Sequence, residues 1–400
     1  MKKFFLKNKK NIKIFDLGNH PFADTFISSK ELVKKEPIYP LRCMLDKKSG
    51  CIFNEVITSD KKRYNLYDYS YTSSNSKYSK NYWKRYAINF KKKYKFKGKI
   101  LEIGCNDGFL LKQLNIKGFK TYGCDASKFI CDLSKKSNLK ILNFIFNLKS
   151  SRKIKKKIGF VDYVIANNVL NHSNNPDNFI KGVKNMLNDD GYFIFEQPYW
   201  LDMIKTSRID QIYHEHITYF TLKFSNWILE KNGMYLYDYE KSSYHGGSLR
   251  VIAKKKNNFL NQNFNKINKA IQTEEKFGLF KKKIYINITR RLENKKKILL
   301  KKITNYKKKN FKIVGIGAAA KANTFLCYFN LNNKIIDFVT DASKFKIGKY
   351  TPKTRIPIYS DDILKKKNVK VVAIILSWNI SELIKTKLRK FNKNLKFIKL

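Results

Sequence analysis

The feature that most constrains the fold is a series of short apolar segments, each followed by a polar turn and a helical pattern. Residues 99–103 (KILEI) are typical of a buried strand, the turn after them contains Gly104 and Gly108, and residues 109–114 (FLLKQL) favour a helix. Further strand patterns lie at 120–124, 161–166 and 192–195. Strands that alternate with helices predict an α/β fold with a parallel, Rossmann-like sheet.

The turn after the first of these strands has the features of a cofactor site. A glycine turn lets the backbone approach a ligand closely, and the following helix presents free N–H groups. The turn reads G-C-N-D-G rather than the G-x-G-x-x-G of a dinucleotide site, and Glu102 lies two residues before its first glycine. This pattern resembles motif I of class I S-adenosylmethionine (SAM)-dependent methyltransferases. A doubly wound domain whose glycine serves only as a turn is the alternative.

Three residues after later strands extend this prediction. Asp125 ends the next strand, about 20 residues after the turn, where a carboxylate can bind both ribose hydroxyls of an adenosine. Asn167 and Asn168 follow the 161–166 strand. We expect Glu102 to approach the amino group of the methionyl moiety. The predicted SAM site consists of Glu102, Gly104, Asn106, Gly108, Asp125, Asn167 and Asn168.

A chain of 400 residues exceeds one ordinary domain, which indicates several folded units. We expect a small, loop-rich lobe over 1–78 and a SAM-dependent methyltransferase domain over 79–255. Helical connectors are expected over 256–310, where the sequence is Lys-rich and has no proline. A second Rossmann-like unit is expected over 311–400, because another strand, glycine turn and helix begin there.

The formal charge of +53, from 84 Lys and Arg against 31 Asp and Glu, is extreme. Because the excess is nearly all Lys and is spread along the chain, we interpret it as compositional drift that also favours anionic small molecules. A non-catalytic RNA- or nucleotide-binding protein is the alternative. The N-terminus lacks a continuous apolar segment, and the longest apolar run, at 371–376, is too short to span a bilayer. We expect a soluble cytoplasmic protein without a membrane partner.

Histidine is scarce in this chain, and its placement is informative. Five are present, and two of them flank Glu215 in the segment Y-H-E-H at 213–216. Another, His245, lies in Y-H-G-G-S-L-R at 244–250. The H-E-H spacing differs from the i, i+4 spacing of a zinc-binding helix, so we interpret the cluster as catalytic. A group of core histidines is the alternative.

These segments belong to an ordered set of motifs that resembles the sugar C-methyltransferase family, whose members act on nucleotide-diphosphate keto-deoxysugars. The resemblance covers nearly the whole chain and implies an N-terminal zinc lobe, a central SAM domain and a C-terminal Rossmann-like domain that helps to bind the substrate. The set begins with Leu17-Gly18 and Pro21-Phe22-Ala23 and continues with I-Y-H-E-H at 212–216, H-G-G-S-L-R at 245–250, G-I-G-A-A-A-K-A-N-T at 315–324, Y-T-P and I-P within 350–357, and W-N at 378–379.

The resemblance also implies roles for single residues. His216 matches the family's general base, Tyr213 and Glu215 match its supporting groups, His172 matches a further active-site histidine, and Tyr67 matches a substrate-side tyrosine. In this hypothesis His216 removes the proton from a carbon α to a ketone, and Tyr213 hydrogen-bonds the developing enolate oxygen. A SAM-dependent O- or N-methyltransferase of a sugar or related metabolite is the alternative.

We expect the nucleotide-diphosphate sugar to lie toward the C-terminal unit, where two glycines and a lysine form a turn with a cation beside it. A structural turn with a solvated lysine is the alternative. The predicted substrate-binding residues are His214, His245, Gly246, Arg250, Gly315, Gly317 and Lys321.

The first lobe departs from the family pattern in its cysteines. Family members carry C-x-x-C pairs near the N-terminus and after a P-L motif, but this chain begins MKKFFLKNKK, and Asp46 and Ser49 replace the second pair. Cys43 and Cys51 lie nearby without restoring the spacing. Structural zinc stabilises such lobes directly. We therefore expect that zinc is absent, that no other metal is bound, and that hydrophobic contacts hold the lobe together.

Overall fold

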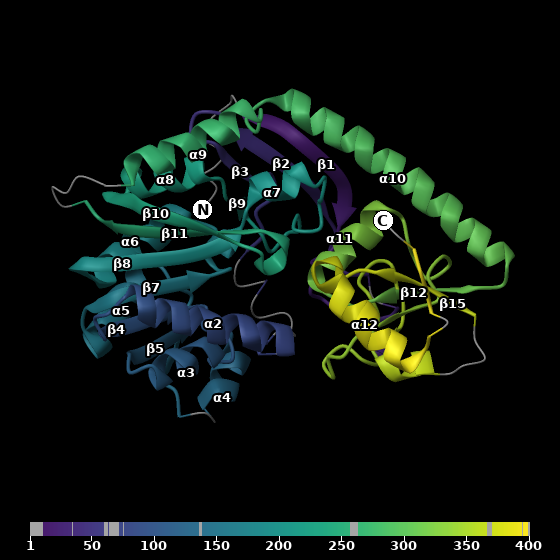
Figure 1. Ribbon diagram of the computed structural model, residues 1–400, viewed down its shortest axis with the longest axis horizontal. Coiled ribbons are helices and arrows are strands. Elements are labelled where there is room, and N and C mark those ends of the chain that lie inside the picture. The colour runs from purple at the N-terminus through teal and green to yellow at the C-terminus, as the bar shows by residue number, and fades with distance from the viewer. Residues whose placement is uncertain are drawn as a thin grey trace.

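The computed structural model describes residues 11–33, 35–59, 63, 72–74, 76–135, 138–256, 263–365, 370–393 and 395–398. Within these residues the strands form three sheets, one in each of the regions that Figure 1 separates. A small antiparallel sheet lies between a large mixed sheet and a smaller parallel one.

The central sheet has the strand order β10-β11-β8-β7-β4-β5-β6. Neighbours from β8 to β6 pair in parallel, and β11 and β10 add an antiparallel hairpin beside β8. The parallel strands are buried and rich in Ile and Val because helices cover both faces. The strands are β4 (Lys99–Ile103), β5 (Lys120–Asp125), β6 (Ile141–Asn143), β7 (Val161–Asn167), β8 (Leu187–Pro198), β10 (Met234–Ser242) and β11 (Ser248–Lys255). The predicted Rossmann-like α/β fold is confirmed.

The helices around this sheet begin where their capping residues predict. Asn147 and Thr221 accept hydrogen bonds from N–H groups of the first turns of α5 and α8, and Pro176 is the first residue of α6. Helix α2 ends at Lys93, five residues before Gly98. The helices are α2 (Lys77–Lys93), α3 (Phe109–Ile116), α4 (Lys128–Lys135), α5 (Leu148–Ile158), α6 (Pro176–Met186), α7 (Trp200–Lys205), α8 (Leu222–Lys231) and α9 (Phe264–Lys276).

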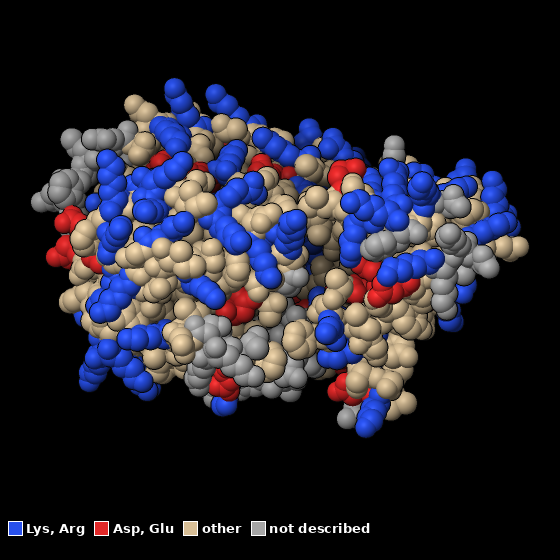
Figure 2. Space-filling model, turned by 60° about the horizontal axis from the view of Figure 1, so that its bottom comes forward, with Lys and Arg blue, Asp and Glu red and all other residues tan. Residues whose placement is uncertain are grey.

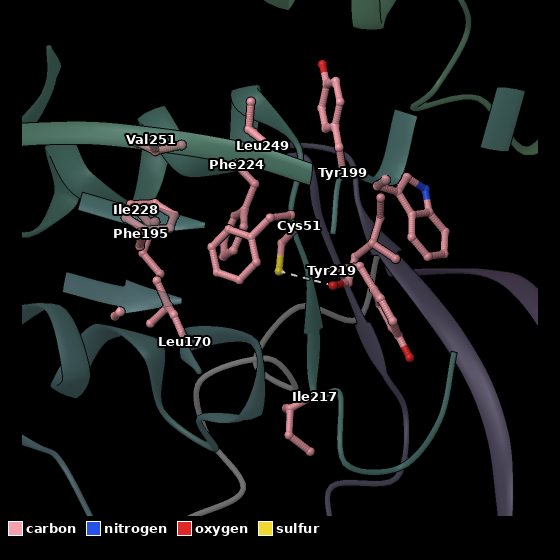
Figure 3. Close-up of a cluster of buried hydrophobic side chains, with 14 of the residues drawn as sticks. Cys51, Leu170, Phe195, Tyr199, Ile217, Tyr219, Phe224, Ile228, Leu249 and Val251 are labelled. Atoms are coloured by element: carbon pink, nitrogen blue, oxygen red, sulfur yellow. Dashed lines mark hydrogen bonds between the residues drawn. The ribbon is translucent and has the colours of Figure 1, made fainter. Parts of the chain in front are cut away.

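The first lobe is an antiparallel sheet whose last strand comes from the middle of the chain. Its order is β1 (Ile12–His20), β2 (Tyr39–Asp46), β3 (Cys51–Asn54) and β9 (Thr218–Tyr219). Its hydrophobic core is continuous with that of the central sheet. In Figure 3, Cys51 of β3 lies in the same cluster as Phe224 of α8 and Leu249 of β11. The lobe and the central domain therefore pack as one body.

The C-terminal sheet is parallel and has the order β14-β13-β12-β15-β16. The long helix α10 (Lys282–Lys308) reaches it from the first lobe (Figure 1), and its two ends pack into different cores. The remaining elements are β12 (Lys312–Ile316), β13 (Phe338–Thr340), β14 (Ile358–Tyr359), β15 (Val371–Ile375), β16 (Lys396–Phe397), α11 (Ala320–Tyr328), α12 (Ser381–Phe391), and the 3-10 turns η1 (Ser29–Glu31), η2 (Leu170–His172), η3 (Tyr244–Gly246), η4 (Asp361–Lys365) and η5 (Trp378–Ile380).

The surface charge follows no single stripe. Figure 2 shows Lys and Arg side chains spread over the visible face, above both the central and the C-terminal domains. Among the described residues, none of the helices is both long enough and apolar enough to cross a membrane.

Candidate active site

The turn between β4 and α3 is held in a tight, left-handed conformation. Gly104 and Gly108 have φ angles of 67° and 71°, and a Cβ atom on Gly104 would lie 2.1 Å from Val169. The carboxylate of Asp125 accepts the backbone N–H of Asn106 at 3.0 Å, which ties the end of β5 to this turn. Only glycine at position 104 combines this backbone with this close approach.

A cavity of about 350 Å³ opens beside this turn. It lies at the carboxyl ends of the parallel strands, where open α/β sheets bind their ligands. It brings together most of the predicted cofactor residues with two of the predicted active-site histidines. Its lining includes Glu102, Gly104, Asn106, Asp125, Asn167, Asn168, His172 and His245. Gly108 borders it from the N-terminus of α3.

The cavity contains buried polar atoms that suit SAM. Among the described residues, Oε2 of Glu102 and Oδ1 of Asn168 have no hydrogen-bond partner. Burial, together with the nearby Asp107 and Asp125, raises the pKa of Glu102 well above its usual range. A cationic ligand would supply the missing countercharge, and its N–H and O–H groups would satisfy these acceptors. The residues present therefore fit SAM, which carries an ammonium and a sulfonium group.

Two serines at this site escaped the sequence prediction. The backbone N–H of Ser73 donates to Oδ1 of Asn106 at 2.7 Å, and the hydroxyl of Ser74 donates to Asp107 at 2.6 Å. Ser73 also lines the cavity. Both serines belong to a cluster of Tyr and Ser residues before α2 that also contains Tyr67, the residue predicted from the family resemblance. That tyrosine lies outside the described residues.

His216 and Tyr213 form a hydrogen-bonded pair beside the cavity. Nδ1 of His216 lies 2.8 Å from the carbonyl oxygen of Gln211, and Nε2 lies 2.6 Å from the hydroxyl of Tyr213. Because a carbonyl only accepts, Nδ1 carries the proton, and Nε2 accepts the Tyr213 hydroxyl. The ring of His172 stands edge-on to His216, with 4.9 Å between centroids.

Burial keeps both of these histidines neutral. It lowers the pKa of His216 to about 3, and it lowers the pKa of His172 well below its usual range. A neutral imidazole is the form in which histidine takes a proton, and the Nε2 lone pair of His216 becomes available for this once the Tyr213 hydroxyl leaves it. His216 is not itself in the cavity lining, but its ring contacts His172, which is, so the loop between α7 and β9 places a neutral base directly behind the cavity wall.

The neighbours of His216 in sequence face the first lobe. Oε1 of Glu215 accepts the backbone N–H groups of Ala23 and Asp24 at 2.8 and 3.1 Å, and burial raises the pKa of Glu215 to about 7. His214 is fully buried and lies 3.1 Å through Nε2 from the carbonyl oxygen of Tyr39. Both residues thus join the loop to the lobe, and His214 is not among the residues that line the cavity. The substrate role of His214 stays a prediction that these contacts do not support.

Residues of the C-terminal domain meet the central domain near His245. Gly246 permits this approach, because a Cβ atom there would lie 1.9 Å from the ring of Trp378. Arg208 stacks on Trp378, with its guanidinium 3.8 Å from the ring centre, and the Trp378 indole donates to Asp210 at 2.7 Å. Lys321 donates to Asn379 and lies 5.0 Å from the ring centre of Trp378.

His245 and Lys321 therefore face a common region between the two domains. Burial lowers the pKa of Lys321 to about 8. Burial, and then the charge of Lys321, lower the pKa of His245 to about 3. His245 and Lys321 are 76 residues apart in the sequence, and the fold brings them close enough to interact electrostatically.

Three other predicted substrate residues have packing contacts. Arg250 donates to the fully buried Glu196 at 2.7 Å and to Glu240 at 3.0 Å. A Cβ atom on Gly315 would lie 2.7 Å from Leu376, and one on Gly317 would lie 2.2 Å from Ser377. The ion pairs account for the arginine at position 250, and the close approaches account for the glycines at positions 315 and 317. A substrate role for Arg250, Gly315 and Gly317 stays a prediction without support from this geometry.

The hairpin that carries zinc ligands in related lobes is closed here by hydrogen bonds. The hydroxyl of Ser49 donates to Asp46 at 2.7 Å and accepts the backbone N–H of Cys51 at 3.2 Å. Burial raises the pKa of the Cys43 and Cys51 thiols. The described residues contain no group of three metal-ligating side chains. The residues of this hairpin do not fit a structural zinc site.

Comparison with known proteins agrees with this architecture. Residues 77–238 match the methyltransferase domain family, and residues 243–399 match the family described as the C-methyltransferase C-terminal domain. The C-methyltransferase NovU of Streptomyces niveus is 24% identical over 280 residues, which cover 70% of this chain and 66% of NovU. The match therefore spans just under two thirds of the length of NovU.

Solved structures resemble parts of the chain. The PH0226 protein of Pyrococcus horikoshii OT3 is 17% identical, with a TM-score of 0.39 over 50% of this chain and 100% of that one. Magnesium protoporphyrin IX methyltransferase of Synechocystis PCC 6803, solved with bound SAH, is 15% identical, with a TM-score of 0.36 over 44% of this chain and 83% of that one.

The fold, the cavity at the carboxyl edge of the sheet and the methyltransferase domain match define a SAM-dependent methyltransferase. SAM is its cofactor. Within this class the chain is similar to C-methyltransferases, because residues 243–399 match the C-methyltransferase C-terminal domain and NovU is described as a C-methyltransferase. The family predicted from the sequence motifs is confirmed.

Proposed function

We propose that this protein methylates a carbon α to a ketone in a nucleotide-linked deoxysugar. The observation that carries the proposal is the neutral His216–Tyr213 pair beside the cofactor cavity. Carbon becomes a nucleophile when a base removes the α proton, so a C-methyltransferase of a ketone needs a base at this place. Further support comes from the similarity to NovU, which is described as a C-methyltransferase.

One domain binds the cofactor, and another binds the nucleotide part of the substrate. Glu102, Asn106 and Asp125 hold SAM on residues 79–255, and Asn167 and Asn168 complete its site. SAM supplies an electrophilic methyl group when it is bound. The domain over 311–400 holds the nucleotide part of the substrate, and we place the reaction in the cytoplasm.

The proton step follows from the hydrogen bonds of His216. Nε2 takes the α proton, and the Nδ1–H···O=C bond to Gln211 stabilises the resulting imidazolium. Before this transfer the Tyr213 hydroxyl leaves Nε2, which frees the lone pair, and donates instead to the ketone oxygen of the substrate, where the enolate charge develops. An anionic substrate beside the imidazole raises its pKa, because negative charge favours the charged form.

Lys321 is the proposed anchor for the diphosphate. Among the described residues, its ammonium group has Asn379 and the Trp378 ring as neighbours and forms no salt bridge. The carboxylate of Asp210 interacts with Lys321 without forming a salt bridge, and a partly buried cation that lacks a direct carboxylate contact attracts an anionic ligand. His245 and Gly246 line the same region and complete the proposed substrate site.

The test is a screen of keto-sugar nucleotides with methyl-labelled SAM. The label should appear in a methyl group bonded to carbon, which 13C NMR distinguishes by its chemical shift from an O- or N-methyl group. In D2O, with S-adenosylhomocysteine in place of SAM, the enzyme should also exchange the α proton of the accepted substrate. Methyl transfer to oxygen or nitrogen without α exchange would exclude the proposal.

A further inference from the structure

The loop that carries the base is held by side chains from the C-terminal domain. The hydroxyl of Thr324, in α11, donates to the carbonyl oxygen of Ile212 at 2.7 Å. That carbonyl is adjacent in the chain to the Gln211 carbonyl, which fixes Nδ1 of His216 at 2.8 Å. A displacement of this peptide would therefore move the imidazole.

A second connection runs through the first lobe. The amide of Asn323, also in α11, donates to the carbonyl oxygen of Ala23 at 2.5 Å. The N–H of Ala23 donates in turn to Glu215, directly before His216. Asn54 holds the other side of the loop by donating to the carbonyl oxygens of Tyr213 and His216, at 2.9 and 2.7 Å.

Comparison with other threonines of the chain shows that Thr324 is unusual. The hydroxyls of Thr289 and Thr304, in α10, donate to the carbonyl four residues earlier in their own helix, at 2.9 and 3.0 Å. This is the ordinary choice for a helical threonine. Thr324 donates instead across the domain interface.

The position of Thr324 and Asn323 in α11 supports the same conclusion. Each is 2% exposed, while Ala322 and Leu326 of the same helix pack into the C-terminal core. Packing alone requires only apolar residues, and buried polar groups cost stability unless they are hydrogen-bonded. Two consecutive buried polar residues that donate hydrogen bonds to groups outside their own domain therefore indicate a role in holding the loop that carries His216.

We infer that Thr324 and Asn323 are positioning residues for the Tyr213–His216 pair, an inference that rests on the proposed function of that pair. Through them the C-terminal domain sets the geometry of the base as well as contributing to the substrate site. Thr324 acts directly on the loop backbone, and Asn323 acts through Ala23 and Glu215.

The test compares Thr324→Val with Thr324→Ser and Thr289→Val in the full-length protein. Valine keeps the shape of threonine without the donor, serine restores the donor, and Thr289→Val removes an equivalent hydroxyl bond away from the loop. We expect Thr324→Val to lower kcat about 10- to 100-fold, because small misplacements of a catalytic group have effects of this size. KM for the keto-sugar nucleotide and the affinity for SAM should change less than about twofold, as expected for a group that only positions the base. Serine should restore most of kcat, and Thr289→Val should leave it unchanged.

A second measurement does not depend on activity. In protein labelled with 15N-histidine, Thr324→Val should shift the ring signals of His216 and leave those of His20 in place, whereas Thr289→Val should shift neither. Wild-type kcat and an unchanged His216 signal in Thr324→Val would overturn the inference. If wild-type protein neither methylates nor exchanges any keto-sugar nucleotide while Thr324→Val still shifts His216, the proposed function fails and the positioning role stands.

Discussion

Two glycine turns of this molecule have nearly the same hydrogen bonds but different surroundings. After β4, the N–H of Gly104 donates to the carbonyl of Cys124, and Asp125 then accepts the N–H of Asn106. After β12, the N–H of Gly317 donates to the carbonyl of Thr340, and Asp341 accepts the N–H of Ala318 at 2.7 Å. In both, an aspartate at the end of the next strand closes a glycine turn.

The difference lies in what occupies the space beside each turn. The first opens on a cavity with the unpaired carboxylate oxygen of Glu102. At the second turn, Gly315 takes the position that Glu102 has at the first, two residues before the turn glycine. Ser377 packs against that glycine, Gly317. Lys346 donates to the carbonyl of Ala318 at 2.8 Å. A strand, glycine turn and aspartate thus build the scaffold, but open space and unpaired polar atoms make the cofactor site.

The largest expected effect concerns the base beside the first turn. His216→Asn should lower methyl transfer about 100- to 10,000-fold, the usual contribution of a positioned general base. It should also abolish α-proton exchange with S-adenosylhomocysteine and leave SAM affinity nearly unchanged, since the cofactor residues lie on β4, β5 and β7. Steady-state kinetics, exchange by NMR and calorimetry measure the three quantities.

His214→Asn is the control for this variant. Its ring packs against Phe22 and Tyr39, so we expect a lower melting temperature and a smaller catalytic loss. Full exchange in His216→Asn together with its loss in His214→Asn would mean that the base has been assigned to the wrong histidine.

Substitutions of Asp125 and Asp341, the aspartates that close the two turns, test the comparison directly. Asp125→Ala should weaken SAM binding by about 1–3 kcal/mol, because ribose hydroxyls and the N–H of Asn106 lose their acceptor. Asp341→Ala removes the same kind of turn bond from the second unit, so it should lower the melting temperature without changing SAM affinity. Equal SAM affinities of the two variants, by calorimetry, would mean that the turns do not differ in function.

A smaller effect is expected from Glu215, which joins the loop to the first lobe. Burial raises its folded pKa to about 7, above the usual 4.5, so the folded state holds more protons than the unfolded state between these values. Its contribution to stability therefore decreases as pH rises from about 4.5 to 7. Glu215→Gln should gain stability relative to wild type between pH 5 and 8, on the order of 1 kcal/mol. Denaturation curves of wild type and Glu215→Gln across this range measure the difference. If the free energies of unfolding of the two proteins depend on pH in the same way, the Glu215 carboxyl is not buried.

No effect at all is expected from metal removal. Because Ser49 and Asp46 close the β2–β3 hairpin, dialysis against a chelator should change neither the melting temperature nor the activity. Metal analysis of protein purified without added metal should find no stoichiometric zinc. One zinc per chain that disappears in Cys43→Ala or Cys51→Ala would contradict this account.

The sequence predicted the parts of this molecule that depend on local pattern. The β4 turn, Asp125 and the asparagines after β7 follow from strand, turn and helix signals within short segments, and they do line one cavity. In the irregular loop before β9, side-chain directions depend on tertiary contacts. There Tyr213 and His216 pair with each other, whereas His214 and Glu215 face the lobe.

Long-range contacts account for what the sequence did not reveal. Arg250 matched a family motif, but its partner Glu196 lies on a neighbouring strand whose pairing no local pattern gives. Ser73 and Ser74 contact the cofactor turn from a segment with no regular structure. The bond from Thr324 to Ile212 joins two domains. Such contacts follow from the assembled fold alone.

The pairing of β9 with β3 has a consequence for how the chain assembles during synthesis. Strands β1, β2 and β3 leave the ribosome first, but the edge of β3 has no partner until Thr218 and Tyr219 emerge. By then most of the central domain has been made, so the nascent lobe waits with an open strand edge. Open edges invite pairing with other chains.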